Sequence, residues 1–252
     1  MRNGVARFAL AVPFPLLIVA AWWLVGSSSP AARGVIATPP DVMMAFARLI
    51  TSGKLWNDVA VSLARALGGW AAALAIAAPL GIAMARRTGL RKIVGPVLNL
   101  LRPISPVAWI PVAILWFGIG YGSKIFIVGI ISFFVILSNA FHAAASIDPL
   151  LLKAVRTFTR SRVRMTLYVV LPASLPGVMN GAQFALSSAW GGVIIAEYTG
   201  ANSGVGYEML HAANLFLPAQ VMASMVTVAI VGYLLNAAFK AVAQTKLGRK
   251  YV

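Results

Sequence analysis

The residues that could carry out bond chemistry are few and lie far apart in this sequence. The chain has no cysteine, which excludes thiolate nucleophiles and thiolate metal sites. Its two histidines, His142 and His211, are predicted to lie on opposite sides of a membrane, so one chain cannot form a histidine metal site. No G-x-x-x-x-G-K-[ST] loop occurs, and no two of the five carboxylates are spaced as an acid–base pair. We therefore expect no catalytic residue, no metal site and no cofactor bound by this chain.

Polar side chains recur at intervals of three or four residues between positions 177 and 197, which places them on one helical face. The members of this stripe are Asn180, Gln183, Ser187, Trp190, Ile194 and Glu197. Polar groups inside a membrane span face the protein interior or a water-filled cavity. The stripe therefore predicts a translocation pathway, with Glu197 as an outer gate or a contact for a delivery protein. Hydrogen bonding between packed helices is the alternative explanation.

Basic residues form a second stripe between positions 145 and 175. If one helix covered this segment, positions 153, 156, 160 and 164 would share a face and Phe158 would lie opposite. Asp148 is a plausible N-cap, and Pro149 suits the first turn of a helix. The pattern predicts an amphipathic helix that lies on the membrane surface or docks a cytoplasmic subunit.

The composition of the chain indicates which elements must position these residues. Of its 252 residues, 60% are hydrophobic and only 10% are charged, which excludes a typical soluble domain and intrinsic disorder. The hydrophobic stretches are continuous rather than alternating, and they are long enough for membrane-spanning helices. We therefore expect a single all-α membrane domain over 1–252. The six predicted spans are 8–26, 64–85, 99–118, 125–144, 177–197 and 219–240.

Two of these spans carry small residues that allow close helix packing. Gly177 and Gly181 have the G-x-x-x-G spacing, and the second span is rich in alanine and glycine. The segment 41–55 before that span has the apolar pattern of an interfacial helix.

The net charge of +16 is explained mostly by the orientation of the chain. With both termini in the cytoplasm, sixteen of the 21 basic residues fall on the cytoplasmic side. The five basic residues on the outer side are Arg33, Arg48, Lys54, Arg65 and Lys124. Nucleic-acid binding needs basic residues interleaved with exposed aromatics or a recognition fold, and the sequence shows neither. We expect the basic surface to face anionic lipid instead.

Several segments together resemble one family. The sequence D-P-L-L-L-K-A-V-R-T-F-T-R-S over 148–161, followed by V-V-L-P-A-S-L-P-G over 169–177, is similar to the coupling loop of ABC-importer permeases. The segment L-R-P-I-S-P-V-A-W-I-P over 101–111 resembles the nitrate, sulfonate and taurine branch of those permeases. Two positions depart from the family pattern: the acidic residue of the loop is Lys153 here, and its glycine is Thr159.

The resemblance implies a type I importer permease with a cytoplasmic coupling helix between spans four and five. It also implies a homodimer in the bacterial inner membrane, two cytoplasmic ATPase subunits that bind ATP and Mg²⁺, and a periplasmic or tethered solute-binding protein. ATP-driven alternating access would import a small anionic or zwitterionic solute such as a sulfonate, nitrate or taurine. The residues carried over as ATPase-coupling residues are Lys153, Ala154, Val155, Arg156, Thr157, Phe158, Thr159, Arg160 and Arg164.

Two other functions remain compatible with a basic membrane protein. A self-sufficient carrier or channel would need ionisable groups inside its spans, and five of the six predicted spans contain no carboxylate. A membrane scaffold without transport activity would explain the basic loop, but it would not explain the polar stripe.

Overall fold

The computed structural model describes residues 13–29, 34–159 and 161–251, and every regular element within these ranges is helical. The two longest helices are α5 (Lys54–Arg86) and α13 (Pro218–Tyr251). The remaining elements are α2 (Pro13–Ser27), α4 (Pro39–Thr51), α6 (Thr88–Leu101), η1 (Pro106–Trp109), α7 (Ile110–Phe117), α8 (Tyr121–Ala145), α9 (Pro149–Phe158), α10 (Arg162–Met165), η2 (Thr166–Val170), α11 (Leu171–Glu197) and α12 (Val205–Asn214).

Four helical segments are long and apolar enough to cross a membrane. They are α5, α8, the continuous segment Val163–Glu197, and Pro218–Ala243 within α13. The sixth predicted span began at about residue 219, and α13 begins at Pro218. Of the first predicted span, the part before Pro13 lies outside the described residues, and α2 is a shorter apolar helix.

The third predicted span, 99–118, requires a correction because it is not one straight helix. The chain bends by 95° between Thr88–Leu101 and Pro106–Phe117. Pro103 and Pro106 flank the bend; each proline lacks a backbone donor and disfavours helical geometry in the preceding residue. The prolines therefore divide this segment into α6 and the shorter η1–α7 pair.

The fifth predicted span also starts earlier than expected. The sequence predicts it over 177–197, but the backbone is already helical from Arg162 and stays helical through Pro172 and Pro176. The π-helical turn η2 lies directly before α11, and its wider hydrogen-bonding pattern leads the chain into that helix. Both prolines are accommodated within the helical path.

Helices α5, α8 and α11 pack closely because glycines line their contacts. A Cβ on Gly181 would lie only 2.4 Å from Cβ of Asn139, and one on Gly177 would lie 2.5 Å from Cβ of Ala143. On α5, a Cβ on Gly81 would lie 2.7 Å from the Leu137 carbonyl oxygen. The predicted close packing of the second and fifth spans is therefore confirmed.

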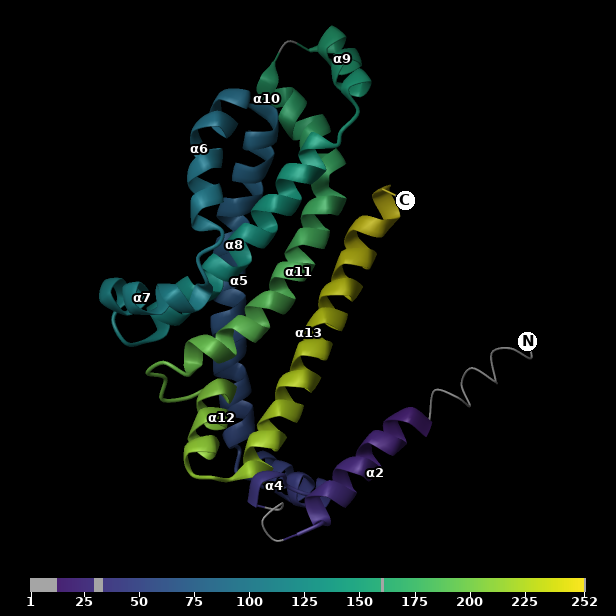
Figure 1. Ribbon diagram of the computed structural model, residues 1–252. Helices are drawn as coiled ribbons and strands as arrows, with labels where there is room; N and C mark the ends of the chain where they lie inside the picture. Colours follow the sequence, from purple (N-terminus) through teal and green to yellow (C-terminus); the bar gives the residue numbers. More distant parts are fainter. Residues whose placement is uncertain (1–12, 30–33, 160, 252) are drawn as a thin grey trace, which may run out of the picture.

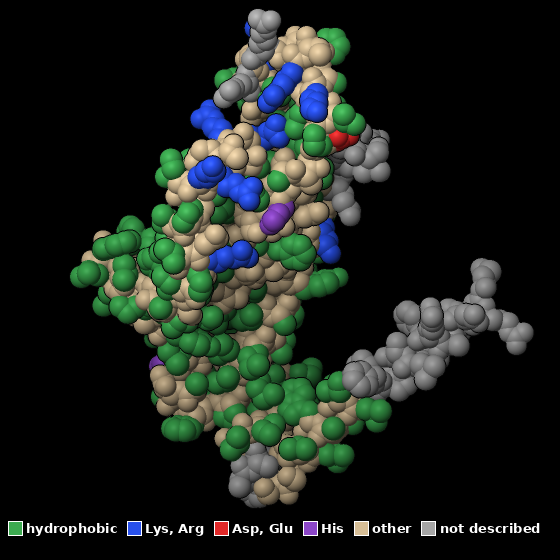
Figure 2. All heavy atoms as spheres, turned by 45° about the horizontal axis from the view of Figure 1, so that its top comes forward, with side chains coloured by type: hydrophobic (Ala, Val, Ile, Leu, Met, Phe, Trp, Pro, Cys, Tyr) green, Lys and Arg blue, Asp and Glu red, His purple; other side chains and the backbone are tan. Residues whose placement is uncertain are grey.

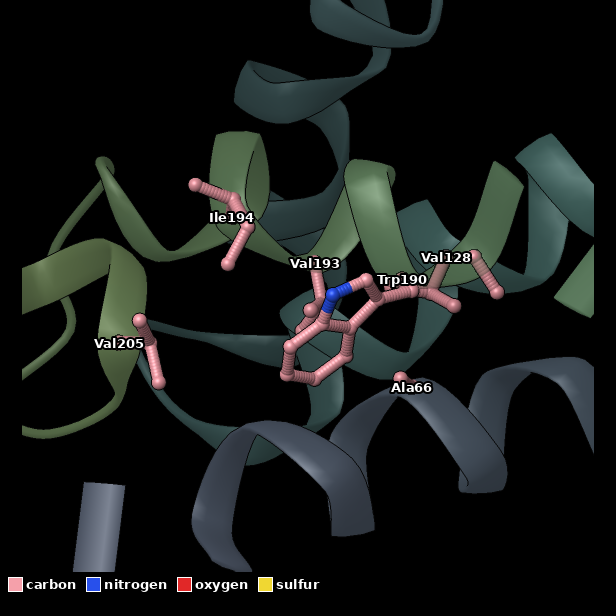
Figure 3. Close-up of a cluster of buried hydrophobic side chains, with 7 residues drawn as sticks. Ala66, Val128, Trp190, Val193, Ile194 and Val205 are labelled. Carbon is pink, nitrogen blue, oxygen red and sulfur yellow. The ribbon is translucent and has the colours of Figure 1, made fainter. Parts of the chain in front are cut away.

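The largest side chain of the central core is Trp190, which points from α11 towards Ala66 on α5 (Figure 3). Val193 and Val128 lie beside the indole, and its Nε1 donates to the Val228 carbonyl oxygen of α13 at 2.9 Å. With Val128 of α8 and Val205 of α12, this cluster joins five helices: α5, α8, α11, α12 and α13. The core therefore holds the central bundle together.

The helical bundle has two opposite ends (Figure 1). We call the end that carries α9 and α10 the α9 end, and the opposite end, which carries α4 and α12, the α12 end. Helix α13 contacts α4, α11 and α12, whereas α2 projects away from the bundle and contacts α4.

Candidate functional site

A buried polar network at the α12 end joins α5 to the turn between α11 and α12. Three of its side chains, Asp58, Ser62 and Arg65, are spaced four and three residues apart, so they share one face of α5. All three are buried, as is Glu197 at the last position of α11. Burying a charge is costly unless it is paired and hydrogen-bonded, so the partners of these residues show whether the network is structural.

Glu197 is the centre of this network and is only 1% exposed. Arg65 Nη1 donates to its Oε1 at 2.7 Å, and Ser62 Oγ lies 2.8 Å from the same oxygen. The backbone N–H of Gly206 donates to Oε2 at 2.9 Å. Gly206 lies in the first turn of α12, where the helix dipole also favours a carboxylate. Both oxygens of Glu197 are therefore engaged.

The same face of α5 holds the turn that follows Glu197. Asp58 Oδ1 accepts from the Gly204 N–H at 2.8 Å, Ser62 Oγ accepts from the Val205 N–H at 2.9 Å, and Arg65 Nη1 donates to the Ser203 carbonyl oxygen at 2.7 Å.

Gly204 is required at its position in this turn because its φ is +117°. In addition, a Cβ there would lie 2.4 Å from Glu197 Oε1. No residue with a side chain fits at this position without moving the carboxylate.

Two further cations of the α12 end are also engaged. Lys54 forms an ion pair with Glu208, which also accepts a hydrogen bond from the side chain of Gln220. Lys124, on α8, is buried and donates to the Gly200 carbonyl oxygen at 3.0 Å. Three of the five basic residues assigned to the outer side thus have partners within the chain. The network works as a structural clamp between α5, α8, α11, α12 and α13.

The predicted pathway stripe is divided by the structure into two halves. Trp190, Ile194 and Glu197 are buried within the chain, whereas Asn180 and Ser187 are exposed and Gln183 is half-buried. Ser187 Oγ donates to Asn236 Oδ1 of α13 at 2.8 Å. The six residues therefore do not line one surface of a single chain, and a pathway role stays a prediction.

Helix α9 begins as the sequence predicts. Asp148 Oδ1 accepts from the Leu150 N–H at 2.7 Å and caps the helix, and Pro149 occupies its first turn. The helix ends at Phe158, and Thr159 continues in extended backbone with φ −147°. An extended residue needs no glycine, so threonine is compatible with this position.

The predicted continuous basic stripe requires a correction. Lys153 and Arg156 lie on α9, but Arg164 lies on the separate helix α10 because α9 stops at Phe158. Arg160 lies outside the described residues.

Leu152 is the one buried residue of α9, and the other residues of this helix are exposed or half-buried. Leu152 is buried in a cluster that includes Val170. Leu150 is 70% exposed and Phe158 is 90% exposed. The other predicted coupling residues are exposed or half-buried: Lys153, Ala154, Val155, Arg156, Thr157, Thr159 and Arg164. The helix thus presents apolar and basic side chains outward from the α9 end.

Sequence reasoning missed the network at the α12 end. Its signal was present in the spacing of Asp58, Ser62 and Arg65, which are polar residues on one face of an apolar helix. Within the described part of the chain, no three His, Cys, Asp or Glu side chains lie close enough together to hold a metal ion.

Comparisons with known proteins assign the family. The model of the family "Binding-protein-dependent transport system inner membrane component" matches residues 77–245. The chain is 32% identical over 222 residues to the putative aliphatic sulfonates transport permease protein SsuC of Bacillus subtilis, covering 87% of this chain and 80% of that protein. It is 27% identical to the taurine transport system permease protein TauC of Escherichia coli, covering 89% and 84%.

A solved structure supports the same fold. The chain matches an inward-facing conformation of the MetNI methionine ABC transporter with a TM-score of 0.66 and 21% identity, covering 73% of this chain and 92% of that chain. The apolar helical spans and the similarity to these relatives agree. The chain therefore belongs to the family of binding-protein-dependent transport system inner membrane components, the membrane-spanning permease subunits of ABC transporters.

Proposed function

We propose that this chain is the permease of an ATP-driven importer for a small anionic or zwitterionic solute, and that it works by alternating access. The named solutes of two relatives, aliphatic sulfonates and taurine, support this solute class. The working unit is a homodimer in the bacterial inner membrane, with two ATPase subunits and a solute-binding protein. The chain itself forms and breaks no bonds, and ATP and Mg²⁺ bind to the partner subunits.

The observation that carries the proposal is the exposure of α9. A short capped helix that leaves Phe158 90% exposed at the end of a bundle presents a typical protein-binding feature. The exposed basic residues Lys153 and Arg156 favour an acidic groove on the partner. ATP binding closes the ATPase pair, and α9 transmits that movement to α8 and α11 through the loops on either side of it.

The distribution of charge supports a cytoplasmic position for the α9 end. On the face that Figure 2 shows, Lys and Arg side chains gather on the half that carries α6, α9 and α10, and hydrophobic side chains cover the other half. At the α12 end, Lys54, Arg65 and Lys124 are engaged by partners within the chain. Unpartnered basic charge is therefore concentrated at the α9 end, as the positive-inside rule requires of a cytoplasmic side.

The network at the α12 end supports an external energy source. Glu197, the one carboxylate of the polar stripe, is committed to Arg65, Ser62 and Gly206. A proton-coupled carrier needs an ionisable group that can exchange protons along the path. We infer that the clamp instead keeps the outer half of the permease rigid and presents the 198–204 turn to the solute-binding protein.

Coupling can be tested by charge reversal on α9. The Lys153→Glu/Arg156→Glu variant should lose solute-stimulated ATP hydrolysis in the reconstituted transporter, because both reversals place negative charge against the acidic groove. Lys92→Glu is the matched control, since Lys92 is exposed on α6 near the same end of the bundle. Unchanged hydrolysis in the α9 variant, or an equal loss in the control, would refute the docking role.

A further inference from the structure

A groove between α6 and α8 is lined by basic side chains that belong neither to the clamp nor to α9. Arg91, Arg102 and His142 line it, together with the polar side chains of Asn99 and Ser138. The groove has a volume of about 250 Å³, and no carboxylate is among the residues that line it. Its remaining wall is largely apolar. The groove therefore combines cationic donors with a hydrophobic floor.

The geometry of α6 and α8 produces this arrangement. Arg91 and Arg102 are eleven residues apart, about three helical turns, so they share the face of α6 that meets α8. The two helices run in opposite directions (Figure 1). The guanidinium carbon of Arg91 lies 5.2 Å from the centroid of the Phe141 ring, which holds the side chain by a cation–π contact. This contact leaves the N–H groups of Arg91 available to a ligand.

The lengths of α5 and α6 indicate how deep Arg102 lies in a membrane. Helix α5 has 33 residues and is about 50 Å long, which exceeds a hydrocarbon core of about 30 Å by about 10 Å at each end. Helix α6 starts beside the α9 end of α5, and Arg102 directly follows its 14 residues, about 21 Å away along the axis. With α5 centred in the core and aligned with the membrane normal, Arg102 lies about 10 Å inside the core. This corrects the charge count from the sequence, which placed Arg102 on the cytoplasmic side.

All five carboxylates have hydrogen-bond or ion-pair partners that lie outside this groove. Asp148 caps α9, and the others lie at the α12 end: Asp41 with Thr38, Asp58 with Gly204, Glu197 with Arg65, and Glu208 with Lys54. A cation at membrane depth without a counter-ion is costly unless it faces water or binds an anion.

We propose that the α6–α8 groove is a binding site for an oxyanion group, either a sulfonate or a phosphate, with Arg102 as its deep contact. Arg91 and His142 lie nearer the α9 end of the groove. Guanidinium groups pair with such oxyanions through two parallel N–H···O bonds. The same group is offered by the headgroup of an anionic phospholipid and by a small soluble sulfonate. The site does not depend on ATPase docking by α9.

Ligand binding to the full chain in phosphatidylcholine nanodiscs tests the site. Phosphatidylglycerol is one probe, and sodium methanesulfonate, compared with sodium chloride at equal ionic strength, is the other. The shift in unfolding temperature gives an apparent Kd for each. We expect the Kd of at least one probe to rise about fivefold for Arg91→Gln or Arg102→Gln and about thirtyfold for the double variant.

The double variant Arg87→Gln/Lys92→Gln is the matched control, because it removes two exposed charges near the same end of α6 that do not line the groove. A response to phosphatidylglycerol assigns the ligand to lipid, and a response to methanesulfonate assigns it to a soluble anion; either supports the proposal. Arg102→Lys, which keeps the charge, should retain most of the binding. Equal Kd values in the two double variants for both probes, or a loss in Arg102→Lys as large as in Arg102→Gln, would overturn it.

Discussion

Removing one partner of the Arg65–Glu197 pair should strongly destabilise the permease. The Arg65 side chain is only 9% exposed and Glu197 is fully enclosed, so neither charge can be rehydrated when its partner is lost. Leaving a buried charge unpaired costs about 3–5 kcal/mol of unfolding free energy. We expect a loss in this range for Glu197→Ala and for Arg65→Ala.

The double variant distinguishes a coupled pair from two independent residues. With both charges removed, no uncompensated charge remains, so the loss should fall below the sum of the single losses by about 2 kcal/mol or more. Equilibrium unfolding in mixed detergent micelles measures all four proteins. Single losses below about 1 kcal/mol that simply add would refute the assignment of this pair as a structural clamp.

Ser62 provides a second test of the same network. Ser62→Ala removes the donor to Glu197 and leaves the Val205 N–H without its acceptor, at a cost of about 1–3 kcal/mol. Ser188→Ala is the matched control, because the Ser188 hydroxyl donates to the Phe184 carbonyl oxygen within its own helix. The control should change the unfolding free energy by less than about 0.5 kcal/mol. Equal losses in the two variants would contradict a special role for Ser62.

Three further predictions concern single positions. Gly204→Ala should cost about 2 kcal/mol or more of unfolding free energy, since its φ is +117° and a Cβ would strike Glu197; a neutral effect in thermal unfolding would contradict the turn geometry. Gly181→Ala should cost about 1–3 kcal/mol by overpacking α11 on α8, whereas Gly89→Ala, with open space around it, should not destabilise. Phe158→Ala should weaken ATPase binding by about 2 kcal/mol in a pull-down titration and leave unfolding unchanged, because the ring is 90% exposed; unchanged affinity would exclude Phe158 as an anchor.

The local patterns of the sequence predicted the long elements well. Continuous apolar segments identified α5, α8, α11 and α13, because a membrane span must satisfy its backbone internally and is mostly apolar. The Asp148–Pro149 pair likewise identified the start of α9, because an N-cap and its following proline act within one turn.

The errors arise where a count of uncharged residues ignores prolines and where contacts join distant parts of the chain. Counting uncharged residues could not locate the 95° bend, because Arg102 and two prolines fall inside a segment that is otherwise apolar. The clamp depends on contacts between Arg65 and Glu197, which are 132 residues apart, and on a turn geometry set by Gly204. The spacing of Asp58, Ser62 and Arg65 marks one face of α5, but only the fold shows which distant residues that face contacts.

The central claim is that α9 joins this permease to a separate ATPase. Native mass spectrometry of the detergent-solubilised complex, with the chain co-expressed with the ATPase subunit of its own transport system, tests this claim most directly. We predict two 26.6 kDa permease chains with two ATPase chains, and loss of the ATPase from the Lys153→Glu/Arg156→Glu variant. A permease that never retains an ATPase, or a charge-reversed variant that retains it fully, would contradict the account.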